Sequence, residues 1–217
     1  MLKVNHLSIG YGDHPLVRDI SFELAPGACV LLAGANGTGK TTLLKTLASG
    51  GTAHIILIPT DIPKVKGFTV EAFVRTGCYQ ESDWKGRISK DVERKMEEAL
   101  EILGIQELED RDISTLSDGE FKKACLTVGL TRQADVLLLD EPTAFLDVEN
   151  RISVLETLRD AARKTGKAVL FSSHDLHDAL RVADRVLALT RDGRFLASGP
   201  TDREAVLQEA FPGLTAP

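Results

Sequence analysis

A glycine-rich stretch over residues 34–42, GANGTGKTT, constrains the fold more than any other part of the chain. The apolar run 29–33 precedes it, and residues 43–47 continue with the spacing of an amphipathic helix. This order predicts a buried strand, a tight turn and a helix. In such a turn, consecutive backbone amides and the positive end of the helix dipole can surround a phosphate. A plain glycine turn before a helix is the competing interpretation, and the flanking strand and helix favour phosphate binding.

The residue types within this loop suit the phosphates and the bound cation of a nucleoside triphosphate. Lys40 is predicted to reach the β- and γ-phosphates, Thr41 to place its hydroxyl on Mg²⁺, and Thr42 to lie near the α-phosphate. The remaining turn supplies backbone amides, because its glycines permit conformations that other residues avoid. The predicted nucleotide-binding residues of the turn itself are Asn36, Gly37 and Gly39.

A second apolar run, residues 136–139, ends in two adjacent carboxylates, Asp140 and Glu141. Parallel sheets bind ligands at the carboxyl ends of their strands, so both side chains should lie beside the glycine-rich loop. Asp140 suits the coordination shell of Mg²⁺, and Glu141 suits the polarisation of an attacking water. Two acids after a strand can also be simple turn formers, but the apolar strand before them favours the functional interpretation.

Two further side chains allow both a functional and a structural interpretation. His174 follows the apolar run 168–173, where it could contact a γ-phosphate or could be an ordinary structural histidine. Tyr11 lies in a glycine turn near the predicted nucleotide, where its ring could stack on adenine or could simply pack. Position alone does not separate these possibilities.

The segment Leu116-Ser117-Asp118-Gly119-Glu120 precedes a helical apolar pattern. Ser117 and Glu120 have the spacing of a capping box, which by itself predicts only a well-capped helix. Gly119 adds a second possibility, because the bare amides of a glycine-containing helix start can face an anion.

The remaining pattern predicts an α/β fold. Alternating residues 2–9 and 21–24 indicate two antiparallel strands, and apolar runs separated by helical segments indicate a mostly parallel sheet flanked by helices. Helices are expected over residues 91–103 and 148–164, a hairpin over residues 185–198 and a C-terminal helix over residues 201–211. The expected fold class is therefore an α/β phosphate-loop NTPase core with a small antiparallel β region.

Composition excludes several classes of protein. A net charge of −6 over 217 residues argues against a surface built to bind nucleic acid. Cys29, Cys78 and Cys125 are widely spaced in apolar or helical context, as reduced core thiols are. The apolar runs have only strand length, so no membrane span is expected and any role at a membrane would require a partner.

The order of these motifs resembles the ATP-binding-cassette (ABC) family over nearly the whole chain. Residues 34–42 resemble its Walker A motif, residues 116–120 its signature sequence and residues 136–141 its Walker B motif. Residues 144–147 are similar to the D-loop that ends in Asp147, while His174 resembles the switch histidine and Tyr11 the adenine-stacking aromatic. Other phosphate-loop proteins, such as nucleotide kinases, lack the Leu-Ser-Asp-Gly-Glu helix start.

The resemblance implies ATP as substrate, Mg²⁺ as cofactor, and a homodimer that binds each ATP between Walker A of one subunit and the signature of the other. It implies partners as well: integral membrane permease subunits and, indirectly, an extracytoplasmic substrate-binding protein. The location would be cytoplasmic, peripheral at the inner face of the cell membrane. Residues 1–60 and 134–217 would form the core of a single domain, and residues 61–133 the helical subdomain. The residues of these motifs are most similar to those in the ATPases of importers for iron-siderophores, haem or cobalamin.

The chain departs from the family pattern at Thr60, where the family has a glutamine that approaches Mg²⁺ and the attacking water. The segment before it, residues 50–53, is also shorter than the usual β-hairpin. These departures keep open a second hypothesis, in which the chain is a soluble, non-transport ABC protein or a nucleotide-gated binding module with weak hydrolysis.

Overall fold

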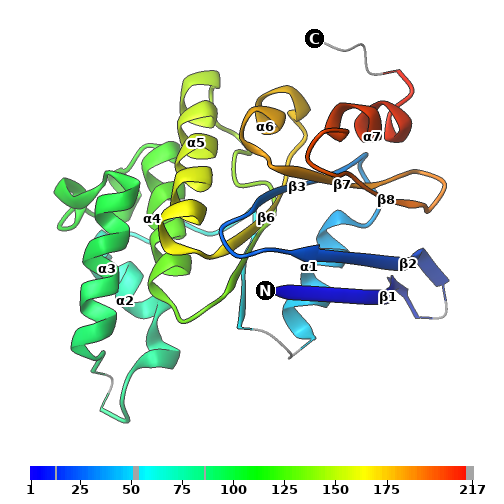
Figure 1. Ribbon diagram of the computed structural model, residues 1–217. Coiled ribbons are helices and arrows are strands. Elements are labelled where there is room, and N and C mark those ends of the chain that lie inside the picture. Colours follow the sequence, from blue (N-terminus) through cyan, green and yellow to red (C-terminus); the bar gives the residue numbers. More distant parts are fainter. Residues whose placement is uncertain (13, 51–53, 86, 214–217) are drawn as a thin grey trace.

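The computed structural model of the chain describes residues 1–12, 14–50, 54–85 and 87–213. In Figure 1 a central sheet lies between two groups of elements, with helices α5 and α6 on one face and helix α1 with a two-stranded ribbon on the other. Helices α2, α3 and α4 form a separate layer at one side. Among the described residues, no helix is both long enough and apolar enough to cross a membrane.

The strands are β1 (Leu2–Tyr11), β2 (His14–Leu24), β3 (Cys29–Gly34), β4 (Ile55–Ile58), β5 (Val136–Leu139), β6 (Ala168–Ser172), β7 (Arg185–Leu189) and β8 (Phe195–Ala197). The α-helices are α1 (Lys40–Ser49), α2 (Val70–Gly77), α3 (Lys90–Leu103), α4 (Asp118–Thr131), α5 (Val148–Thr165), α6 (Leu176–Val182) and α7 (Arg203–Ala210). Short 3₁₀ turns lie between α2 and α4, at Tyr79–Glu81, Gln106–Leu108 and Ile113–Thr115.

The main sheet has the strand order β4-β5-β6-β3-β7-β8. All neighbouring pairs are parallel except β7 and β8, which form the closing hairpin. Strands β1 and β2 form a separate antiparallel ribbon. The predicted fold class, a mostly parallel sheet with helices and a small antiparallel region, is therefore confirmed.

Both faces of the main sheet are buried, as expected for parallel strands covered on each side. Along β3, for example, Leu31 contributes to the hydrophobic cluster that contains helices α2 to α6, and Val30 and Leu32 contribute to the cluster beneath β1, β2 and α1. This alternation follows from the period of two residues in a strand. It explains why the predicted core strands read as unbroken apolar runs.

Helix α4 joins the helical layer to the sheet. Near its C-terminal end, Gly129 faces strands β4 and β5, and a Cβ atom added there would lie 3.0 Å from Ile58 Cδ1 and 3.2 Å from Leu137 Cδ2. A larger residue at this position would require the Ile58 and Leu137 side chains, or the helix, to shift by a few tenths of an ångström. Gly129 therefore allows the helix to pack closely on the sheet.

The structure differs from the sequence-based prediction in two places. Helix α6 was not predicted, because its seven residues are too few for a helical period to stand out and most of its stability comes from packing on the core. Strand β2 begins at His14, seven residues earlier than predicted, because pairing with β1 extends it through exposed positions. Tyr11 ends β1, and its side chain lies outside the described residues.

We predict that Phe171→Ala lowers the free energy of unfolding by about 3–5 kcal/mol, because it opens a cavity in a fully buried part of β6. Phe145→Ala provides the matched control, since the Phe145 side chain is 84% exposed and its truncation should change stability by less than about 0.5 kcal/mol. Urea denaturation followed by circular dichroism measures both values. Equal losses would contradict the assignment of Phe171 to the core.

Candidate functional site

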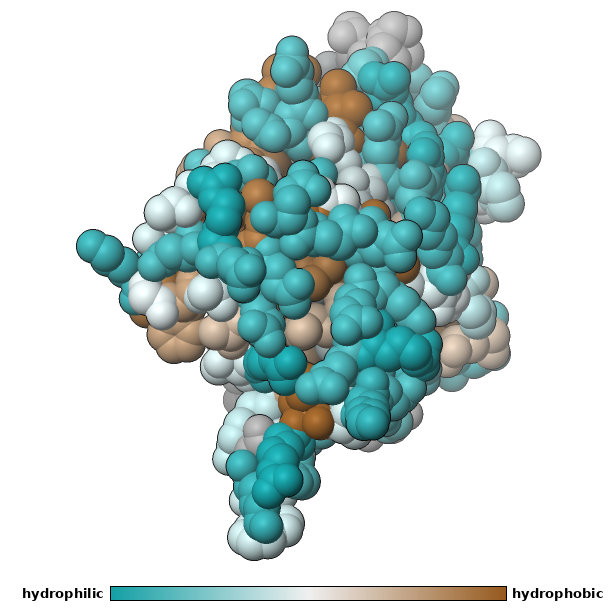
Figure 2. Space-filling view, turned by 90° about the vertical axis from the view of Figure 1, so that its left-hand side faces the viewer, coloured by the Kyte–Doolittle hydropathy of each residue, from teal (hydrophilic) through white to brown (hydrophobic). Residues whose placement is uncertain are grey.

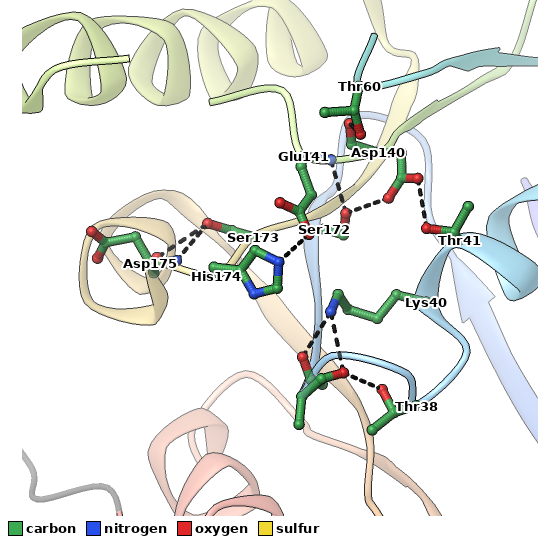
Figure 3. Close-up of polar contacts among 12 residues, drawn as sticks. Thr38, Lys40, Thr41, Thr60, Asp140, Glu141, Ser172, Ser173, His174 and Asp175 are labelled. Carbon is green, nitrogen blue, oxygen red and sulfur yellow. Dashed lines mark hydrogen bonds and ion pairs between the residues drawn. The ribbon is translucent and has the colours of Figure 1, made fainter. Parts of the chain in front are cut away.

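The candidate site lies where the carboxyl ends of four parallel strands meet. Strand β3 leads into the glycine-rich loop, β5 into Asp140 and Glu141, β6 into His174, and β4 into Thr60. Figure 3 shows these side chains converging from segments that are far apart in the sequence. The parallel register places them together, as the sequence predicted for the Walker residues.

The glycine-rich loop is a turn between β3 and α1, and its backbone geometry explains why glycine occupies several of its positions. Gly37 and Gly39 have φ angles of 81° and 101°, a conformation that residues with a side chain rarely adopt. A Cβ added at Gly34 would lie 2.5 Å from Thr38 Oγ1. Asn36 and Gly37 are exposed at the tip of the turn, where their backbone is accessible to a ligand.

Lys40 lies at the start of α1, with its side chain folded back over the loop (Figure 3). Its Nζ donates hydrogen bonds to the carbonyl oxygens of Gly34 at 2.8 Å and Ala35 at 3.4 Å. Burial lowers the pKa of Lys40, while the carboxylates of Glu141 and Asp140 act in the opposite direction. A partly desolvated ammonium group at this position is well placed to attract a polyanion, because few waters need to be displaced.

Asp140 is held by three neighbours that prepare an oxygen-rich site. Its Oδ2 accepts a hydrogen bond from Thr41 Oγ1 at 2.7 Å, and its Oδ1 accepts one from Ser172 Oγ at 2.9 Å. The Thr60 hydroxyl donates to its backbone carbonyl at 2.9 Å. A carboxylate and a hydroxyl side by side are ligands that Mg²⁺ accepts, so the residues present fit this cation.

Sequence analysis did not single out Ser172, which also accepts a hydrogen bond from the Glu141 backbone amide at 2.9 Å. This serine therefore fixes both acidic residues through one hydroxyl. The available signal was its position at the carboxyl end of a buried strand, where a polar side chain is unusual. Its side chain is fully buried.

Glu141 and His174 form an ion pair, with 2.5 Å between His174 Nε2 and Glu141 Oε1. The histidine side chain is about half exposed and the carboxylate is 21% exposed. Glu141 also adopts a φ of 49°, a conformation that is costly for a residue other than glycine and is often kept at functional sites. The structure thus brings together Glu141, which sequence analysis assigned to the attacking water, and His174, for which it left a γ-phosphate contact and a structural role open.

The signature segment forms the N-terminus of α4, with the predicted capping box. Ser117 Oγ accepts a hydrogen bond from the Glu120 amide at 3.2 Å, and Glu120 Oε2 accepts one from the Ser117 amide at 2.8 Å. A Cβ added at Gly119 would lie 2.7 Å from Asn150 Oδ1 on α5. Gly119 is buried, and its lack of a side chain allows the close approach of Asn150.

Asp147 begins α5, where its Oδ1 accepts a hydrogen bond from the Asn150 amide at 2.8 Å. This hydrogen bond and those from the neighbouring amides lower the pKa of Asp147. Arg151, the residue after Asn150, donates a hydrogen bond to the carboxylate of Asp175, which directly follows His174. The first turn of α5 therefore contacts both the signature helix and the histidine loop, a connection that sequence analysis missed.

A family model described as ABC transporter matches residues 17–144, a span that includes the glycine-rich loop, the signature helix and both acidic residues. The chain belongs to the ABC transporter family. It is therefore an ATP-binding protein of the class of transport ATPases, as the motif resemblance predicted.

Relatives and solved structures agree with this membership. The chain is 30% identical to a probable siderophore transport system ATP-binding protein of Bacillus subtilis, YusV, over 89% of this chain and 78% of that protein. It is also 30% identical to the ferric enterobactin transport ATP-binding protein of Escherichia coli, FepC, over 91% and 81% of the two chains. A putative metal-chelate type ABC transporter in an inward-facing conformation has the same fold, with a TM-score of 0.84 at 23% identity over 97% of this chain and 88% of that one.

We predict that Ser172→Ala lowers the free energy of unfolding by about 1–3 kcal/mol, because the part-buried Glu141 amide and the buried Asp140 Oδ1 lose a shared partner. The control is Ser49→Ala, which removes an exposed hydroxyl on α1 and should change stability by less than about 0.5 kcal/mol. Urea titrations of both variants measure the difference. A Ser172→Ala loss no larger than that of Ser49→Ala would refute the bridging role.

Proposed function

We propose that this chain is the ATP-hydrolysing subunit of an importer for a metal chelate, such as an iron-siderophore, haem or cobalamin complex, and works with separate membrane permease subunits. The observation that carries the catalytic part is the Glu141–His174 ion pair beside Lys40 and Asp140 (Figure 3). The named functions of the siderophore and enterobactin relatives support the cargo class.

In this proposal each part of the site has a distinct role. The loop amides and Lys40 bind the triphosphate, with Asn36, Gly37, Gly39 and Thr42 around it. Glu141 polarises the attacking water, and His174 holds the Glu141 carboxylate in place and contacts the γ-phosphate. Bound Mg²⁺ would neutralise part of the phosphate charge, and Thr41 and Asp140 would hold the ion. Tyr11 would stack on adenine, which remains a prediction.

We further propose that two copies of the chain pair head to tail around ATP. Ser117, Gly119, Glu120 and Asp147 are then the residues that complete the partner's site. The dipole of helix α4 supports this assignment, because its positive end lies at the N-terminus that Ser117 and Gly119 form. Residues 1–60 and 134–217 would act as the core of each copy, and residues 61–133 as its helical subdomain.

The permease contact is proposed for the segment between α2 and α3. This segment projects from the lower end of the helical layer in Figure 1 and forms a lobe at the foot of the largely hydrophilic face in Figure 2. It carries two large exposed aromatic residues, Tyr79 at 72% and Trp84 at 89% exposure. Exposed aromatic side chains are typical anchors of protein interfaces.

We expect Glu141→Gln to bind Mg-ATP like the wild type but to hydrolyse it about 10²–10⁴-fold more slowly, because the amide cannot accept the proton of the attacking water. Glu149→Gln, an exposed acid in the first turn of α5, is the control and should retain activity. A coupled phosphate-release assay gives the rates, and a fluorescent nucleotide gives the affinity. Wild-type hydrolysis by Glu141→Gln would remove that residue from the mechanism.

The Glu141→Gln protein also tests the pairing of subunits. It should elute as a dimer with Mg-ATP and as a monomer with ADP, because the γ-phosphate is the group that both copies bind. A monomer under both conditions would contradict the proposal that the signature helix completes the ATP site of a second copy.

The double substitution Tyr79→Ala and Trp84→Ala should abolish co-purification with the permease while leaving nucleotide affinity unchanged, because it removes the proposed anchors far from the glycine-rich loop. His6→Ala removes another exposed ring, on the β1–β2 ribbon, and should have no effect. Pull-down from membranes that contain the permease measures both. A wild-type chain that binds no permease of its own operon would support the second hypothesis, a non-transport ABC protein.

A further inference from the structure

The linker that connects β4 to α2, residues 59–69, is fastened to the signature helix by two lysine side chains. Lys122, in the second turn of α4, donates a hydrogen bond from Nζ to the Thr60 carbonyl oxygen at 2.6 Å. Lys64 donates from the linker to the Leu116 carbonyl at 2.8 Å and to Asp118 Oδ1 at 2.7 Å. The start of α4 and the linker therefore form one hydrogen-bonded unit.

Thr60 is in turn attached to the acidic end of β5. Its hydroxyl donates to the Asp140 carbonyl at 2.9 Å, and the Asp140 amide donates to the Ile58 carbonyl at 3.0 Å. The Asp140 carboxylate accepts the next hydrogen bond in this series, from the Thr41 hydroxyl at 2.7 Å. Three successive hydrogen bonds thus lead from Lys122 through Thr60 and Asp140 to Thr41.

This connection lies at the edge of a hollow rather than in a packed interface. A cavity of about 410 Å³ is lined by residues of the linker, of α4 and of the loop after β5, including Thr60, Lys122 and Phe145. Beside this hollow, Ile62 of the linker packs on the apolar cluster that contains Phe121 of α4, and the Lys64 ammonium lies over the Phe121 ring. These contacts hold the linker near the helix but do not reach the Thr60 carbonyl. The Lys122 ammonium group is the direct polar contact between α4 and Thr60.

We propose that Lys122 is a positioning residue that couples the two nucleotide sites of a dimer. Through Thr60 it ties the helix that serves the partner's ATP to the carboxylate that serves the chain's own ATP. Occupation of one site then favours the closed arrangement of the other, which appears as cooperativity in ATP concentration. This inference rests on the proposed function and assigns a regulatory role within it.

The test compares Lys122→Met with Lys123→Met. Methionine keeps most of the length of the side chain and removes the charged donor, and Lys123 is the neighbouring lysine on the same helix. In the Glu141→Gln background, Lys122→Met should require about tenfold more Mg-ATP for dimerisation, since a hydrogen bond from a charged group is lost. Lys123→Met should dimerise like the parent protein. Size-exclusion chromatography with light scattering gives the midpoints.

Two further measurements separate positioning from a structural effect. With Glu141 intact, the Hill coefficient for ATP hydrolysis should fall toward 1 in Lys122→Met from a value between 1 and 2 in the wild type, because two sites are coupled. The affinity of the monomer for a fluorescent ADP analogue should stay unchanged, because Lys122 does not contact the chain's own glycine-rich loop. Lys122→Arg, which retains a charged donor, should restore both dimerisation and cooperativity.

A second variant tests the route through Thr60. Thr60→Val removes the hydroxyl that bonds to Asp140 but keeps the carbonyl that Lys122 uses, so it should produce the same loss of cooperativity. The double variant should be no worse than the more affected single one, because both changes interrupt one chain of contacts. Additive losses, or wild-type cooperativity in Lys122→Met, would overturn the inference. A wild-type chain that neither hydrolyses ATP nor dimerises would overturn the proposed function instead.

Discussion

The parallel hydrogen-bond ladder of the main sheet is the constraint on which the site depends. It aligns the carboxyl ends of β3, β4, β5 and β6, so that four loops distant in sequence end at the same edge. Burial on both faces makes this register strict, because a slip of one residue would exchange the two hydrophobic faces. The polar side chains after each strand are therefore held in place by apolar packing beneath them.

Within this frame, one carboxylate organises its neighbours. The Asp140 carboxylate accepts hydrogen bonds from the hydroxyls of Thr41 on α1 and Ser172 on β6, and the Asp140 backbone carbonyl accepts one from Thr60. Such preorganisation reduces the reorganisation needed when charge develops at the site. The backbone at Glu141, with its positive φ, directs the next carboxylate toward His174 instead of continuing the strand. Local strain and the register of the sheet thus direct two adjacent acids toward different partners.

Motifs whose chemistry is carried by consecutive residues could be predicted from the sequence, as could the apolar strands that deliver them. The capping box of Ser117 and Glu120 is an example, because a spacing of three residues determines the contact. Contacts between distant segments could not be predicted in this way. Ser172, Arg151 and Lys122 acquire partners only through the arrangement of strands and helices, and the position of Ser172 at the end of an apolar run was the one signal among them. Helix α6 escaped prediction because tertiary packing supports it.

The close packing at Gly129 has a mechanical consequence for helix α4. Gly129 contacts the sheet near the C-terminal end of the helix, and Ser117 lies twelve residues away at the other end, about 18 Å along the axis at 1.5 Å per residue. A tilt of about 10° about this glycine would move the signature end by roughly 3 Å, since displacement grows with distance from the pivot. Phe121, Ala124 and Cys125 are buried on the turns between, so the core around them would have to move with the helix.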